Sequence, residues 1–103
     1  MIIKNGVGLL GLRPEIIIAV IVANDIYKSE GHELVITCGT DGVHGDWSLH
    51  YLGLAIDIRI NYFKTMKQKK RVVKKLKAAL GKQFKVILEK DHIHISFRPK
   101  VKA

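Results

Sequence analysis

The sequence has 103 residues, of which 48% are hydrophobic, and this length predicts one small domain with a modest apolar core. Its 18 lysine and arginine residues outnumber 9 acidic residues, and the formal net charge of +9 favours polyanionic partners. The single cysteine, Cys38, excludes an internal disulfide and a multi-cysteine zinc cluster. A bound metal would therefore need histidine and carboxylate ligands.

The first predicted elements are an N-terminal arm and a helix. Residues 1–13 are apolar and Gly-rich, and we expect an extended arm lying over the single domain of residues 1–103. Pro14 suits the first position of a helix that runs to about Glu30 and ends at Gly31. The apolar run Ile16–Ala23 is too short to span a bilayer, and the charges beside it argue against a signal peptide. We therefore expect a buried helix and no membrane span.

The middle of the chain predicts two strands with a loop between them. Glu33–Cys38 has the composition of a buried strand, with Cys38 as an apolar filler, and Gly39–Trp47 has the composition of a loop. Leu54–Ile60 alternates between two faces. The first face is apolar and predicted to be core, whereas the second is small and charged: Leu54, Ile56, Ile58 and Ile60 against Ala55, Asp57 and Arg59.

A second helix and a hairpin follow. Lys64–Leu80 predicts a helix whose inward stripe is Val72, Val73, Leu76, Ala79 and Leu80. Phe84–Glu89 and His92–Phe97 predict a hairpin around Lys90 and Asp91, and a two-residue turn would place Glu89 opposite His92. In the last strand the core face is Ile93, Ile95 and Phe97, and the outward face is His92, His94 and Ser96. The expected fold class is α+β, with two helices packed on a small antiparallel sheet.

Histidine and carboxylate side chains recur on the polar faces and loops of this arrangement: His44, His50, Asp57, Glu89, Asp91, His92 and His94. A catalytic zinc ion takes three such ligands and keeps a fourth position for water, whose proton a nearby acid or histidine accepts. Each histidine taken alone is more often solvated than a ligand. Asp57 is harder to explain, because an acid between Ile56 and Ile58 is costly unless it is paired, and Arg59 on its face could be the partner. Spacing alone leaves a metal site and a paired structural acid equally open.

The segment "SLHYLGLAID", Ser48 to Asp57, resembles the S-x-H-x-x-G-x-A-x-D signature of the zinc D-alanyl-D-alanine peptidase family. That family includes carboxypeptidases, dipeptidases and the L-alanyl-D-glutamate endopeptidases of phage endolysins. Its zinc fold also occurs in the amino-terminal domain of hedgehog proteins. This chain is similar to hedgehog in "SLHY", in "HIH" and in the position of His44. The resemblance implies that zinc lies on the sheet of a hedgehog-like fold, and the expected order of elements agrees with it.

The resemblance also implies the roles of individual residues. His50, Asp57 and His94 would be the zinc ligands. The peptidases carry a general base three residues before the last ligand, which is Asp91 here, whereas hedgehog-like domains place a glutamate further upstream, which favours Glu89. Strand parity favours Glu89 and family spacing favours Asp91, and we expect Asp91. His92 and His44 would orient a ligand or stabilise the oxyanion.

One position departs from the family pattern. Family peptidases often carry T-S-G-x-R before the signature, but this chain has "TCGTDG", with Asp41 where the arginine would fall. Arg59 or His44 would then compensate in binding the substrate carboxylate. Ser48 is a further expected substrate contact, and Trp47 is equally suited to be a substrate platform or a cover for the loop. Otherwise the substrate carboxylate is not bound in the family's way, and the departure argues against classical carboxypeptidase specificity. The hedgehog resemblance keeps open a catalytically inactive zinc-binding pseudo-peptidase with a structural or binding role.

The expected function is hydrolysis of peptide bonds in peptidoglycan stem peptides, at the cell wall or in the periplasm, by a phage lysis or virion enzyme or a small bacterial remodelling enzyme. Lys64–Lys85 holds ten of the basic residues and no acid, which is typical of a solvated helix face but would also attract anionic cell-wall polymers. Nucleic acid is the less favoured polyanion, because no recognised nucleic-acid-binding motif is present.

Overall fold

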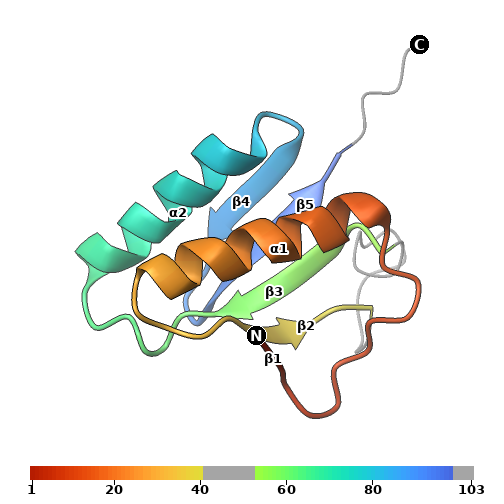
Figure 1. The fold of residues 1–103 in the computed structure, drawn as a ribbon, viewed down its shortest axis with the longest axis horizontal. Helices are drawn as coiled ribbons and strands as arrows, with labels where there is room; N and C mark the ends of the chain where they lie inside the picture. Colours follow the sequence, from red (N-terminus) through yellow and green to blue (C-terminus); the bar gives the residue numbers. More distant parts are fainter. Residues whose placement is uncertain (41–52, 99–103) are drawn as a thin grey trace.

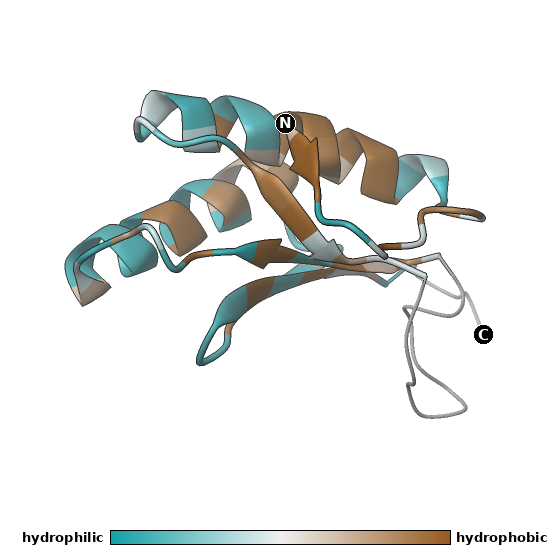
Figure 2. Cartoon of the chain, turned by 90° about the horizontal axis from the view of Figure 1, so that it is seen from below, coloured by the Kyte–Doolittle hydropathy of each residue, from teal (hydrophilic) through white to brown (hydrophobic). Residues whose placement is uncertain are grey.

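The protein forms an α+β fold in which two helices cover one face of a five-stranded mixed sheet (Figures 1 and 2). The computed structural model describes residues 1–40 and 53–98. The strands are β1 (Ile2–Ile3), β2 (Val35–Cys38), β3 (Ala55–Arg59), β4 (Phe84–Leu88) and β5 (His92–Phe97). The helices are α1 (Pro14–Ser29) and α2 (Met66–Leu80). The strand order is β1-β2-β3-β5-β4, so that β4 lies at one edge of the sheet.

The sheet differs from the expected antiparallel sheet at β1. This strand runs parallel to β2, with Ile2 paired with Val35 and Ile3 with Ile36, and the Ile2 N–H donates to the Leu34 carbonyl at 2.7 Å. The other three pairings are antiparallel, as expected. The prediction of a wholly antiparallel sheet is therefore wrong at β1, because a strand of two residues has no period that could identify it within an apolar arm.

The predicted bounds of α1 are confirmed, but the expectation of a buried helix is wrong on one face, where Ile17, Ile18 and Ile21 are 48%, 56% and 59% exposed. The helix has Pro14 in its first turn, and the chain turns away at Gly31, whose φ is +81°. Its buried residues are Ile16, Ala19, Val20, Ala23 and Tyr27. The buried Tyr27 hydroxyl donates to the Arg59 carbonyl at 2.8 Å, and burial raises the pKa of this hydroxyl above its ordinary value. Within residues 1–40 and 53–98, neither helix combines the length and apolar character that crossing a bilayer requires.

Helix α2 packs through a narrower stripe than expected. Thr65 caps its start by accepting the Gln68 N–H at 3.1 Å. Val72 and Leu76 are buried and Val73 and Leu80 are partly buried, but Ala79 is exposed, so its predicted place in the stripe is wrong. Ala79 lies two turns after Val72 on the same side of α2. The helical period therefore places both in one stripe, but it does not show at which residue the contact with the sheet ends.

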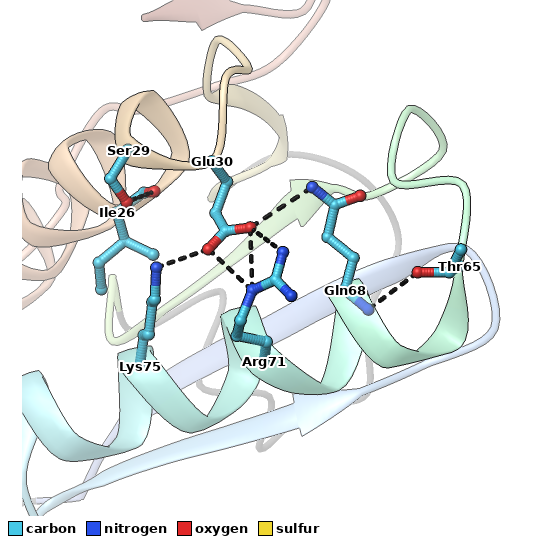
Figure 3. Close-up of polar contacts among 7 residues, drawn as sticks. All are labelled: Ile26, Ser29, Glu30, Thr65, Gln68, Arg71 and Lys75. Carbon is cyan, nitrogen blue, oxygen red and sulfur yellow. Dashed lines mark hydrogen bonds and ion pairs between the residues drawn. The ribbon is translucent and has the colours of Figure 1, made fainter.

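A buried carboxylate joins the two helices (Figure 3). Glu30 ends α1, where the helix dipole disfavours a negative charge, and its side chain is only 5% exposed. Arg71 Nη2 lies 2.7 Å from Glu30 Oε1, Lys75 Nζ lies 2.5 Å from Oε2, and Gln68 also donates to Oε1. These donors from α2 lower the pKa of Glu30 to about 2. The cations of α2 thus stabilise a negative charge that is unfavourable at the C-terminal end of α1.

We expect Glu30→Gln to lower the free energy of unfolding by about 1 kcal/mol at pH 7, because the substitution removes the charge that accepts hydrogen bonds from three side chains. The pKa of Glu30 is lowered from 4.5 to about 2 by folding, so its contribution is complete above about pH 4.5 and is lost as the pH falls toward 2. Urea titrations of both proteins at several pH values measure this. Glu33→Gln is the control, because that side chain is 54% exposed and should contribute little. A difference between wild type and Glu30→Gln that stays constant from pH 7 to pH 2 would contradict the assignment.

Candidate metal centre on the helix-free face of the sheet

The alternation of β3 and β5 separates core residues from polar ones, as the sequence predicts. Ile56, Ile58, Ile93 and Ile95 are all 0% exposed in the core beneath the helices. The intervening side chains of β3 and β5 point to the opposite face, which neither helix covers (Figure 2). That face carries Asp57 and Arg59 from β3 and His92 and His94 from β5.

Asp57 and His94 are brought together by the strand register. They are direct partners in the antiparallel pair of β3 and β5, and Asp57 Oδ1 lies 2.9 Å from His94 Nδ1. Their side chains are 16% and 22% exposed, so both are largely withdrawn from water but still reachable. The pairing with histidine answers how an acid is accommodated between two core isoleucines.

His92 extends this pair into a chain of polar contacts. Its Nε2 lies 3.6 Å from Asp57 Oδ1, and its Nδ1 lies 2.6 Å from Asp91 Oδ1. The contact with His92 lowers the pKa of Asp91, whose side chain is 87% exposed. Asp91 is therefore ionised at neutral pH, which is the form that a general base requires. Arg59, which we expected as a partner of Asp57, is the cross-strand neighbour of His92.

The hairpin turn between β4 and β5 determines where the two candidate general bases, Glu89 and Asp91, lie relative to the pocket. The Glu89 N–H donates to the His92 carbonyl at 2.9 Å, which confirms a two-residue turn at Lys90 and Asp91 with Glu89 opposite His92. Asp91 lines an open pocket of about 380 Å³ beside Asp57 and His92. Glu89 is exposed and is not among the described residues that line this pocket.

The same pocket contains residues that sequence analysis did not assign to a site: Lys4, Thr37, Cys38 and Asn61. Cys38 is half-buried and lies opposite Asp57 in the register of β2 and β3. Its expected role as a buried apolar filler is therefore wrong. An irregularity in the register between Ile36 and Cys38 brings it there, and an apolar strand sequence gives no signal for such a shift. Lys4 reaches the pocket because its N–H bonds the Ile36 carbonyl beside β1.

Ser96 shows that the helix-free face is not uniformly open. It lies on the same face as His92 and His94 but is 1% exposed, so its expected outward position does not make it solvent-accessible. Its hydroxyl has no hydrogen-bond partner among residues 1–40 and 53–98. A buried hydroxyl without a partner costs about 1–3 kcal/mol.

The described residues supply two of the three expected metal ligands. Asp57 and His94 fit a shared zinc ion, because two ligands of one tetrahedral ion at about 2 Å lie about 3.3 Å apart, close to the observed 2.9 Å between their atoms. Within residues 1–40 and 53–98, no group of three or more histidine, cysteine or acidic side chains is placed to hold a metal. The third expected ligand, His50, lies outside these residues, as do His44, Trp47 and Ser48.

The signature glycine, Gly53, is held against the N-terminal segment. Its φ is +73°, and a Cβ built there would lie 2.0 Å from the Gly11 carbonyl oxygen. The Arg13 N–H donates to the Gly53 carbonyl at 2.9 Å. A side chain at this position would therefore push the segment before α1 away from the start of β3.

We expect Gly53→Ala to destabilise the protein by roughly 2–4 kcal/mol, since it combines a left-handed backbone with a steric clash. Gly31→Ala is the matched control, because Gly31 has a φ of +81° but nothing within 4 Å of its added Cβ. That control should cost only about 1 kcal/mol. Thermal and urea unfolding measure both, and equal losses would show that the Gly11 contact contributes nothing.

Comparisons with protein-family models, with curated proteins and with solved structures found no match for this chain. The function is therefore proposed from the chain's own residues and their contacts.

Proposed function

We propose that this chain is a zinc-dependent peptidase with a hedgehog-like, D-alanyl-D-alanine peptidase-type fold that hydrolyses peptide bonds in peptidoglycan stem peptides. The observation that carries the proposal is the Asp57–His94 pair, in which two residues of the expected ligand set are 2.9 Å apart on neighbouring strands. The signature segment that ends at Asp57 supplies the third expected ligand, His50. The α+β fold is compatible with this assignment.

Asp57, His94 and His50 would hold the ion. When bound, zinc would polarise the scissile carbonyl and lower the pKa of a coordinated water toward about 7. His92 would keep the Asp57 carboxylate oriented, since it lies within 3.6 Å of Oδ1.

Asp91 is the proposed general base. Its ionised carboxylate accepts a proton from the attacking water and passes it to the leaving amine. The 2.6 Å contact with His92 fixes one of its oxygens at the mouth of the pocket that Asp57 lines. Glu89 lies on the other side of the same turn and lacks this contact with the pocket, which supports Asp91 over Glu89.

The charges of the pocket suit a peptide with a free carboxylate. Lys4 and Arg59 lie with Asp57 and Asp91 in the 380 Å³ pocket, so cations stand beside the proposed metal and base. Arg59 would bind the substrate carboxylate in place of the arginine that Asp41 replaces, with Lys4 as a second cation. Ser48 and Trp47 remain proposed substrate contacts, and His44 a proposed oxyanion donor.

The resemblance to hedgehog domains supports one alternative, a pseudo-peptidase that binds zinc for a structural or binding role. The two functions share the ligands and differ in turnover, so one experiment separates them. We expect one zinc ion per purified chain and chelator-sensitive release of stem-peptide fragments from purified peptidoglycan, with fragment masses that identify the bond. One zinc ion without cleavage on several wall types would favour the pseudo-peptidase, and a chain that binds no zinc would exclude both.

A matched pair of variants tests the general base. We expect Asp91→Asn to lower kcat by about 10²-fold or more with its zinc content unchanged, because it removes the proton acceptor and leaves the ligands in place. Glu89→Gln changes the same charge two residues away and should retain activity within about threefold. The opposite result, with Glu89→Gln inactive and Asp91→Asn active, would transfer the role to Glu89. His94→Ala should lose the zinc itself.

A further inference from the structure

A second concave surface lies at the opposite edge of the molecule, between α2 and the outer edge of β4. This groove, which we call the α2–β4 groove, has a volume of about 780 Å³. Its lining includes every residue from Phe84 to Leu88, and α2 contributes Lys70, Val73 and Lys77. Because consecutive strand residues point to opposite faces, a groove that touches all five follows the backbone edge of β4.

That backbone edge is open. β4 is the last strand in the sheet order and pairs only with β5 among the described strands. The Glu89 N–H bonds the His92 carbonyl and the Arg98 N–H bonds the Gln83 carbonyl, so odd-numbered positions of this strand direct their backbone groups to β5. The N–H and C=O groups of Val86 and Leu88 therefore point outward into the groove.

The side chains of the groove combine an apolar floor with a basic rim. Val73, Phe84 and Leu88 are partly buried against the core and form the floor. Lys70, Lys77, Lys82 and Lys85 are exposed around it, and none of the described residues that line it is acidic. A helix packed beside an open edge strand is the arrangement in which proteins bind an extended peptide as an added strand.

We propose that the α2–β4 groove binds an extended peptide that carries acidic and apolar residues together on the face turned toward α2, and that pairs with β4 as an additional strand. Its backbone bonds Val86 and Leu88, its apolar side chains rest on Val73 and Phe84, and its carboxylates meet the surrounding lysines. A phosphodiester polymer would use the lysines but would leave the apolar floor and the strand edge without partners. The observations therefore favour a peptide over a polyanion.

The test uses a fluorescent, monomeric peptide of eight residues, Glu-Glu-Val-Val repeated twice, which is long enough to span β4 and carries glutamate and valine on both faces of the strand. We expect saturable binding by fluorescence anisotropy and slower amide exchange at Val86 and Leu88. The same peptide with a fully N-methylated backbone keeps its side chains and charge but has no N–H donors, and it should bind at least tenfold more weakly. Equal binding of the two peptides would overturn strand addition.

Charge variants place the peptide in the groove. Lys70→Glu with Lys77→Glu should weaken binding about tenfold or more, because two rim cations become repulsive. Lys67→Glu with Lys74→Glu changes the same charge on the same helix outside the groove and should weaken it less than threefold. Equal losses in both, together with competition by polyphosphate, would show general attraction of polyanions to α2 and overturn the proposal. No binding at about 1 mM peptide would also overturn it and leave the lysines as protection against edge pairing.

Discussion

β3 and β5 pair so that Asp57 lies opposite His94, while Ile56 meets Ile95 and Ile58 meets Ile93. Because side chains alternate along a strand, a slip of one residue would move Asp57 beneath the helices and expose two isoleucines. The apolar contacts of the core therefore fix the register that places Asp57 opposite His94. The candidate site depends on the hydrophobic core of the other face more than on any contact of its own.

Glu30 and Asp57 are both acids with largely shielded side chains, and their neighbours suit them to different roles. Glu30 is paired with Arg71 and Lys75, which are hydrogen-bond donors to its carboxylate and not the usual ligands of zinc. Asp57 is beside His94 and His92, whose ring nitrogens are of the type that binds metal ions. Glu30 is thus suited to join α1 and α2 permanently, whereas the surroundings of Asp57 are suited to a ligand that arrives after folding.

Local signals predicted most of the fold. Pro14 and Gly31 mark the ends of α1, and the isoleucines of β3 and β5 predict which face is core. The failures all concern contacts with no local period. β1 is too short to show alternation, the register shift before Cys38 has no sequence marker, and the length of the α2 stripe depends on what α2 meets. For the site, strand parity predicted that Asp57 and His94 share a face, but their direct pairing and the arrival of Lys4 follow from strand order. The placement of His50 stays a prediction.

The hairpin of β4 and β5 links the two surfaces of the molecule. β5 carries His92 and His94 toward the helix-free face, while the free edge of β4 lines the α2–β4 groove, and Ile87 of β4 is the direct partner of His94. An edge strand with one neighbour has fewer backbone hydrogen bonds to hold it than a strand within the sheet. A peptide added to β4 would convert it into an interior strand and restrict the hairpin that positions His94. Peptide binding at β4 would thus restrict the position of His94 in the candidate metal centre, although none of the described residues lines both the groove and the pocket.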